Sequence, residues 1–153
     1  MKFKEPRVLI SKERIEATVQ EMADRINQDH QGRELVVVCV LNGAFIFCSD
    51  LVRRIKLPLQ VEFISVSSYG NQTTSSGELT FHMDLKCSIE GKDVLIVEDI
   101  VDTGLTLKKL KDHFLKQGPR MVQLVSFLHK PSRSEHPVDI DYLGQTIDDH
   151  FVI

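Results

Sequence analysis

Hydrophobic residues recur along this chain in patterns that predict three helices. Apolar residues at helical spacing predict amphipathic helices within residues 12–30 and 105–116, and an apolar segment at 44–55 predicts another. Ser11 precedes the first helix and is a residue type that caps helix N-termini. Gly118 follows the last helix and ends it.

Continuous runs of apolar and β-branched residues predict strands between these helices. The predicted strands lie at 35–40, 61–67, 94–97, 121–128 and 138–143, with a shorter one at 80–84. The run at 35–40, L-V-V-V-C-V, is typical of a strand buried on both faces of a sheet. Strands that alternate with helices imply right-handed crossovers and a mainly parallel sheet. We therefore predict one α/β domain over residues 1–153, without repeats or linkers.

A polar stretch, N-Q-T-T-S-S-G, separates the strands predicted at 61–67 and 80–84. Its low hydrophobicity fits a lid or binding loop, and it fits plain disorder equally well. Pairing of the two flanking strands would make this stretch the tip of a long hairpin.

The composition fits a folded domain with a solvated surface. The chain has 153 residues, 42% hydrophobic and 27% charged, and 19 basic against 22 acidic residues give a net charge of −3. No basic block is present, which argues against nucleic-acid binding. The N-terminus does not resemble a signal peptide, and no apolar run approaches the roughly 18 residues that span a bilayer. Three cysteines without C-x-x-C spacing fit reduced thiols, so we expect a cytoplasmic protein that binds no membrane.

The most informative segment follows the strand predicted at 94–97. It concentrates three acids, two threonines and a glycine: Glu98, Asp99, Asp102, Thr103, Gly104 and Thr106. Ligands of an open parallel sheet bind beyond the carboxyl ends of its strands. The turn at 102–106 also opens a helix, whose N-terminal N–H groups have no partners and favour an anion. The segment therefore predicts a phosphate site, although it matches neither common glycine-rich phosphate motif.

The acids would repel a phosphate unless they face another group. Glu98 and Asp99 can accept hydrogen bonds from a pair of sugar hydroxyls, directly or through a divalent cation. Asp102 can exchange a proton with a base beside the sugar. The alternative is structural: Glu98 and Asp99 only end a strand, and Asp102 or Thr103 caps the next helix. The concentration of polar groups at one turn favours the functional interpretation.

Five segments resemble the purine phosphoribosyltransferases, in the order that this family has. V-L-I-V-E-D-I-V-D-T-G-L-T resembles the phosphoribosyl-pyrophosphate signature and is most similar to its hypoxanthine-guanine branch. V-C-V-L-N-G-A-F-I-F resembles the pyrophosphate loop, and V-S-S-Y-G resembles the mobile loop. F-L-H-K-P-S-R and D-D-H-F-V-I resemble the segments that read the purine and stack on it. The resemblance implies the type I phosphoribosyltransferase fold, a mainly parallel sheet flanked by helices with a long flexible hairpin loop and a small hood.

The resemblance also implies a function in purine salvage, the transfer of a phosphoribosyl group from phosphoribosyl pyrophosphate to N9 of hypoxanthine or guanine. The residues implied to bind the phosphorylated ribose are Glu98, Asp99, Asp102, Thr103, Gly104, Leu105 and Thr106. Those implied to bind pyrophosphate are Leu41, Asn42, Gly43, Ser68 and Tyr69. A non-proline cis peptide within residues 41–43 is common in the family. Those implied to bind the purine are Lys130, Phe151 and Val152. Asp102 is implied to be the general acid/base at N7, and Glu98 and Asp99 are implied to hold Mg²⁺.

Lys130 is implied to donate to the oxygen at C6, which selects 6-oxopurines over adenine. Phe151 is implied to stack on the purine, and the Val152 backbone to read its edge. The structural alternatives are a surface lysine and a core aromatic residue. Because Lys130 does not separate hypoxanthine, guanine and xanthine, a xanthine-preferring enzyme is an alternative function.

The chain departs from the family pattern at three places. Asn42 stands where many relatives carry a basic residue, which removes a side-chain contact to pyrophosphate but not the backbone contact. Ser134 replaces a common arginine, so we leave Arg133 out of the predicted pyrophosphate set. The family continues past F-V-I with an aspartate that helps to bind magnesium, so we expect the C-terminal end of the domain to be truncated or disordered.

Two alternatives belong to other classes of protein. One is a regulator on the same fold that senses phosphoribosyl pyrophosphate and binds RNA, which would need a basic face. The other is an α/β domain without catalysis. For the enzyme, the resemblance implies small-molecule substrates as partners, no nucleic acid, and a homodimer or homotetramer.

Overall fold

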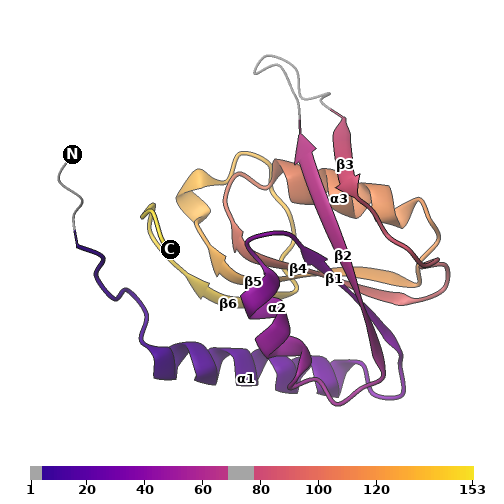
Figure 1. The fold of residues 1–153 in the computed structure, drawn as a ribbon, viewed down its shortest axis with the longest axis horizontal. Helices are drawn as coiled ribbons and strands as arrows, with labels where there is room; N and C mark the ends of the chain where they lie inside the picture. The colour runs from indigo at the N-terminus through magenta and orange to yellow at the C-terminus, as the bar shows by residue number, and fades with distance from the viewer. Residues whose placement is uncertain (1–4, 69–77) are drawn as a thin grey trace.

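The apolar runs form a six-stranded sheet in the computed structural model of the protein, which describes residues 5–68 and 78–153 (Figure 1). The helices are α1 Lys12–Asp29, α2 Phe45–Val52, α3 Leu105–Leu115 and the short 3₁₀ helix η1 Pro131–Arg133. The strands are β1 Leu35–Val40, β2 Leu59–Ser68, β3 Leu79–Met83, β4 Asp93–Val101, β5 Met121–His129 and β6 Tyr142–Thr146. Their order is β3-β2-β1-β4-β5-β6, and neighbours are parallel except β2 and β3. The predicted mainly parallel sheet with a hairpin is confirmed.

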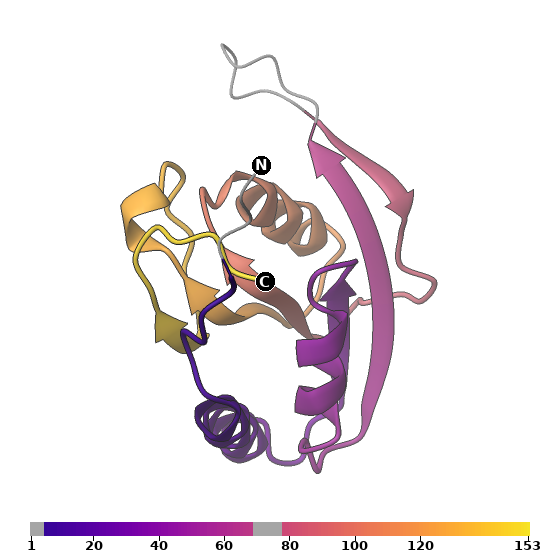
Figure 2. The ribbon, with the colours of Figure 1, turned by 60° about the vertical axis from the view of Figure 1, so that its left-hand side comes forward.

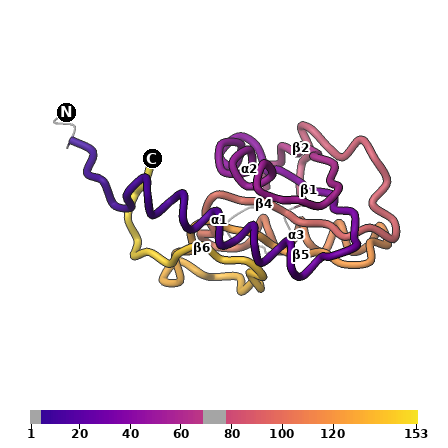
Figure 3. The backbone as a smooth tube through the Cα atoms, turned by 90° about the horizontal axis from the view of Figure 1, so that it is seen from below, coloured from indigo at the N-terminus to yellow at the C-terminus, as the bar shows by residue number. Residues whose placement is uncertain are grey.

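The central strand β1 explains the two layers of helices. All six of its residues are buried, and consecutive side chains point to opposite faces of the sheet. Val37 and Cys39 pack in a cluster with α1 and α2, whereas Val36 and Val38 pack in a second cluster with α3. Helices α1 and α2 therefore cover one face and α3 covers the other (Figure 2). The described N-terminal segment and the C-terminal residues lie on the same side of the molecule (Figure 3).

The start of α1 follows its local sequence. The Ser11 side chain accepts a hydrogen bond of 3.1 Å from the backbone N–H of Arg14, so the predicted cap is confirmed. The buried face of α1 includes Val19, Met22 and Ile26, which keep the predicted helical spacing. No helix in the described part of the chain combines the length and the hydrophobicity that crossing a bilayer requires.

Two strands differ from their predicted ranges. The prediction of a strand at 138–143 is wrong, because Val138 and Ile140 pack into the α3 cluster as an irregular segment and β6 begins only at Tyr142. Strand β4 continues to Val101 instead of ending at 97, because its pairing with β5 continues through the polar residues. Glu98 and Asp99, which were expected to follow this strand, therefore lie within its last four residues.

Candidate active site

The carboxyl ends of β1 and β4 bring three predicted segments together. Glu98 and Asp99 lie near the end of β4, and the turn that follows leads into α3. Residues 41–43 follow β1, the neighbouring strand. The peptide bond between Leu41 and Asn42 is cis, as the resemblance implied.

Gly43 and the acid pair are in direct contact. A Cβ atom placed on Gly43 would lie 2.9 Å from Asp99 Oδ2, so a larger residue at this position would collide with the carboxylate. The carboxylates also bind neighbouring backbone groups, since Glu98 Oε1 accepts from the Asp99 N–H at 3.0 Å and Asp99 Oδ1 accepts from the Ile100 N–H at 2.9 Å. The loop after β1 and the acids of β4 therefore form one continuous surface.

Burial controls the protonation of this acid pair. Loss of water around the Glu98 carboxyl, with a hydrogen bond and charge repulsion from Asp99, raises the pKa of Glu98 to about 9. Glu98 is thus protonated at neutral pH in the substrate-free protein. One carboxyl group can donate a hydrogen bond while its neighbour accepts, which is a combination suited to a pair of hydroxyl groups.

The turn that opens α3 depends on Gly104. This residue is the N-cap and has φ of +87°, a left-handed conformation that favours glycine. Its Cβ would lie 2.2 Å from the carbonyl oxygen of His136, so the turn is packed directly against another segment. No side chain caps the helix, so the structural alternative that Asp102 or Thr103 serves as the cap is wrong.

Backbone hydrogen bonds hold this turn in place. The Thr103 carbonyl accepts from the N–H groups of Glu135 and His136 at 3.2 and 2.9 Å. The first N–H of α3 that bonds within the helix belongs to Lys108, which donates to the Gly104 carbonyl at 3.0 Å. The N–H groups of Leu105 and Thr106 precede it and are of the class that binds anions at helix N-termini.

Lys130 is the only buried lysine in the described part of the chain, with 8% of its surface exposed. It directly follows β5, and its backbone N–H donates to the Val101 carbonyl at 3.0 Å, which fixes it beside the end of β4. Its ammonium group lies 3.8 Å from Asp149 Oδ1. A cation buried at the carboxyl edge of a sheet is positioned for a ligand more than for solvent.

Asp102 has a buried oxygen that no described group satisfies by a hydrogen bond. Asp102 Oδ1 lies 3.1 Å from Arg133 Nε, but the alignment is that of an ion pair without a proper hydrogen bond. Buried carboxylate oxygens usually have donors. This oxygen is therefore available to a donor on a ligand.

The remaining predicted residues lie at the margins of this surface. Ser68 and Thr106 have their hydroxyl oxygens 3.5 Å apart, so the end of β2 reaches the turn of α3. Tyr69 lies outside the described residues. Phe151 is 93% exposed, which makes the alternative of a core aromatic residue wrong, and Val152 is partly buried.

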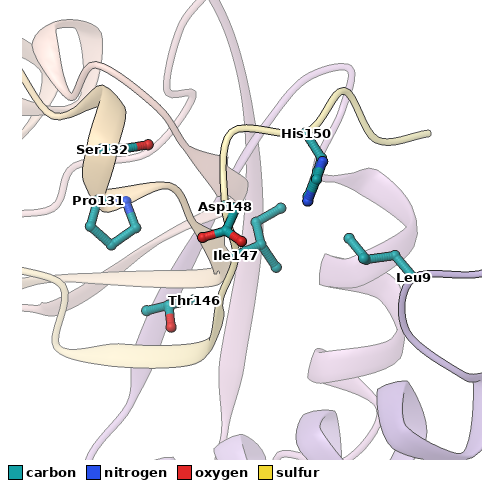
Figure 4. A pocket seen from close by; sticks show the side chains of 7 residues that line it. All are labelled: Leu9, Pro131, Ser132, Thr146, Ile147, Asp148 and His150. Atoms are coloured by element: carbon teal, nitrogen blue, oxygen red, sulfur yellow. The ribbon is translucent and has the colours of Figure 1, made fainter.

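A hollow of about 500 Å³ lies beside this surface and shares none of its charged residues. It is lined by Leu9, Pro131, Ser132, Thr146, Ile147, Asp148 and His150. Figure 4 shows that Leu9 reaches it from the N-terminal segment, whereas the other side chains come from the end of the chain and from η1. This hollow thus does not coincide with the carboxyl edge where the polar groups converge.

Comparison with known proteins identifies the family of the chain. The family model described as "Phosphoribosyl transferase domain" matches residues 9–153. The chain belongs to this family. The resemblance inferred from the five motifs is therefore confirmed, and so is the type I phosphoribosyltransferase fold.

Relatives of this phosphoribosyltransferase carry more specific names. It is 41% identical to the hypoxanthine-guanine phosphoribosyltransferase of Mycobacterium tuberculosis, over 95% of this chain and 75% of that protein. It is 41% identical to the bifunctional protein TilS/HprT of Listeria innocua, over 96% of this chain but only 23% of that protein. The crystal structure of a hypoxanthine-guanine phosphoribosyltransferase from Bacillus anthracis superposes with a TM-score of 0.89 at 40% identity, covering 97% of this chain and 87% of that one. Two of these three relatives are named as hypoxanthine-guanine phosphoribosyltransferases.

Sequence reasoning missed two charged residues of this phosphoribosyltransferase site. Arg133, left out of the predicted set, contacts Asp102, and Asp149, never considered, contacts Lys130. Asp149 is separated from Lys130 by η1 and β6, and nothing in its local sequence distinguishes it from Asp148. Only the tertiary arrangement reveals its position.

Proposed function

We propose that this phosphoribosyltransferase transfers the 5-phosphoribosyl group from phosphoribosyl pyrophosphate to N9 of hypoxanthine or guanine, releasing pyrophosphate, in purine salvage. The observation that carries the proposal is the position of Asp102. Its unsatisfied oxygen belongs to a residue that directly precedes the helix-opening turn, and the adjacent Val101 carbonyl accepts a hydrogen bond from the backbone of the buried Lys130. The names of the relatives, hypoxanthine-guanine phosphoribosyltransferases, favour these bases over the xanthine-preferring enzyme and over the RNA-binding regulator.

The sugar phosphate binds along β4 and the start of α3 in this proposal. The 5′-phosphate lies on the N–H groups of residues 104–106, with the hydroxyl groups of Thr103 and Thr106 as further donors. Glu98 and Asp99 bind the two ribose hydroxyls, directly or through a divalent cation. The transition state resembles an oxocarbenium ion, so holding the ribose in position is a large part of catalysis.

The purine binds between Asp102 and Lys130. Asp102 exchanges a proton with N7, a contribution of roughly 10²–10⁴-fold in rate for a general acid or base. Lys130 donates to the C6 oxygen, and adenine, which has an amino group there, would leave this buried ammonium without an acceptor. Phe151 is exposed and stacks on the base, while the Val152 backbone binds its edge.

The leaving group binds at the loop after β1 and at the hairpin. The backbone N–H groups of Asn42 and Gly43 hold pyrophosphate, because the Leu41 N–H already donates to the Ile64 carbonyl at 2.8 Å. Ser68 with Tyr69 closes over the leaving group and excludes water. Asn42 brings no charge to this contact.

Mg²⁺ is the proposed metal, and its site is complete only when the substrate supplies further oxygen ligands. Within residues 5–68 and 78–153 no group of three or more His, Cys, Asp or Glu side chains could hold a metal by itself. Glu98 and Asp99 are hard oxygen donors of the kind that Mg²⁺ binds together with phosphate oxygens and water. We propose that these two carboxylates hold it with the bound substrate, where it neutralises charge on the pyrophosphate. We further propose a cytoplasmic homodimer or homotetramer composed of single domains over residues 1–153.

An assay with four bases tests the proposed function. The protein is mixed with Mg²⁺, phosphoribosyl pyrophosphate and either hypoxanthine, guanine, xanthine or adenine, and nucleotide formation is followed by chromatography. Inosine and guanosine monophosphates are the expected products, with no adenosine monophosphate. Absence of a nucleotide product with every base would refute the proposal, and a product with xanthine alone would establish the alternative enzyme.

A further inference from the structure

Four charged side chains form a continuous chain of ion pairs across the proposed purine site. Asp102 Oδ1 lies 3.1 Å from Arg133 Nε. Arg133 Nη1 in turn lies 3.6 Å from Asp149 Oδ2. The other carboxylate oxygen of Asp149 lies 3.8 Å from Lys130 Nζ. The order along this chain is therefore acid, base, acid, base, and each charge has an opposite neighbour.

The Lys130 end of this chain is much less exposed than its middle. Lys130 is buried and fixed by its backbone bond to β4. The side chains of Arg133 and Asp149 are about half exposed, at 48% and 50%. Asp149 also lies beyond the last strand, in a segment without helix or strand structure. The two middle side chains can therefore move while the buried end of the chain stays in place.

The two ends of this chain are the groups that the proposed function assigns to the purine, and the inference rests on that assignment. A purine N7 that contacts Asp102 Oδ1 competes with Arg133, whose Nε lies 3.1 Å from that oxygen without a hydrogen bond to it. A C6 oxygen that contacts Lys130 must likewise take the place of Asp149. In the free enzyme, charged side chains of the protein thus lie beside both polar contacts of the purine.

Displacement by the purine leaves the two middle charges paired with each other. When Arg133 leaves Asp102 and Asp149 leaves Lys130, the two middle residues still have each other as partners. A buried lysine without a partner would be costly in the free enzyme, so Asp149 also holds Lys130 in position before the substrate arrives.

We infer that Asp149 is a positioning residue for the proposed reaction, whose carboxylate holds Lys130 and Arg133 in the substrate-free enzyme and is displaced from Lys130 when a 6-oxopurine binds. The contact competes with the purine, so it lowers the affinity of the enzyme for the base. Asp149 touches neither the sugar nor the leaving group, and its effect is confined to the base.

The test compares Asp149→Asn with Asp149→Glu and with the wild-type enzyme. Loss of the charge lowers the KM for hypoxanthine about twofold to fivefold, the range expected for a partly exposed ion pair. The KM for phosphoribosyl pyrophosphate stays unchanged, and kcat changes by less than twofold. The glutamate variant retains the charge and restores a KM near that of the wild type. Because salt screens the ion pair, the ratio of the two hypoxanthine KM values approaches one at about 0.5 M NaCl.

Asp148→Asn is the matched control, since Asp148 lines the hollow of Figure 4 and does not belong to the chain of ion pairs. This variant keeps the KM of the wild type. A KM for Asp149→Asn that equals or exceeds that of the wild type overturns the inference while the proposed function stands. A wild-type protein that forms no nucleotide and binds no inosine monophosphate in calorimetry overturns the proposed function, and the inference with it.

Discussion

Replacement of Gly104 by alanine tests the turn on which the proposed phosphate site depends. The new Cβ would lie 2.2 Å from the His136 carbonyl oxygen, and real Cβ contacts are essentially never shorter than 3.0 Å, so the two groups must separate by at least 3.0 − 2.2 = 0.8 Å. This movement strains the two hydrogen bonds that the Thr103 carbonyl accepts from Glu135 and His136. The change therefore disturbs the phosphate turn itself.

The expected loss of stability follows from these contacts. A left-handed conformation costs an alanine about 1 kcal/mol more than a glycine. Two weakened backbone hydrogen bonds add about 1 kcal/mol each. The free energy of unfolding should therefore fall by about 3 kcal/mol. The KM for phosphoribosyl pyrophosphate should rise at least tenfold, because the displaced N–H groups no longer converge on the phosphate.

Gly91→Ala is the control for this experiment. Gly91 has a similar φ of +69°, but its Cβ would meet no atom within 4 Å. This variant should lose only about 1 kcal/mol and keep the KM of the wild type. Urea denaturation measures the free energies, and initial rates measure the KM. The reasoning is refuted if the two variants are equally stable, or if Gly104→Ala binds phosphoribosyl pyrophosphate normally.

Three further substitutions test separate parts of the structure. Lys130→Gln should lower kcat/KM for hypoxanthine by about 10- to 100-fold in initial-rate assays, since a charged hydrogen bond is lost, and equal activity with both side chains would contradict the proposed base contact. The fold raises the pKa of Glu98 from 4.5 to about 9. Between these pH values the folded protein holds a proton that the unfolded chain releases. The free energy of unfolding therefore falls as pH rises through this range, by up to about 1.4 kcal/mol per pH unit. Glu98→Gln removes this pH dependence. Urea denaturation should therefore show that the variant is more stable relative to the wild type at pH 8 than at pH 6. An equal difference in unfolding free energy at the two pH values would argue against the buried proton. Hydrogen bonds from Arg120, and next from His30, lower the pKa of the buried Asp93. The contribution of Asp93 to the free energy of unfolding is therefore fully present above its unfolded pKa of 3.8 and is lost as pH falls below that value. Asp93→Asn should therefore cost about 3 kcal/mol at pH 7 and up to about 1 kcal/mol less at about pH 3, and an equal loss at both pH values would contradict this.

Local sequence predicted the parts of the fold that local physics determines. The run at 35–40 predicted a buried strand because a strand covered on both faces tolerates only apolar residues. Ser11 predicted the start of α1 because its hydroxyl reaches an N–H three residues later. The strand predicted at 138–143 failed because Val138 and Ile140 are apolar for packing against α3, not for pairing in the sheet.

In the candidate site, too, local sequence predicted the neighbours within one motif but not the contacts between distant segments. Asp102 and Gly104 belong to one short motif, and their proximity follows from the chain itself. The neighbours of Gly104 and Lys130 could not be predicted, because His136 and Asp149 approach them from segments whose path depends on the whole sheet. A single aspartate in a polar segment carries no local signal of the lysine that it will meet.

The turnover of Asp102→Asn measures the central claim most directly. The wild-type protein and this variant are each given phosphoribosyl pyrophosphate, Mg²⁺ and hypoxanthine, and the formation of inosine monophosphate is followed. The account predicts that the wild type forms the nucleotide, while the variant binds the sugar phosphate with similar affinity but turns over about 10²–10⁴-fold more slowly. An Asp102→Asn variant as fast as the wild type would contradict the role of this carboxylate at N7.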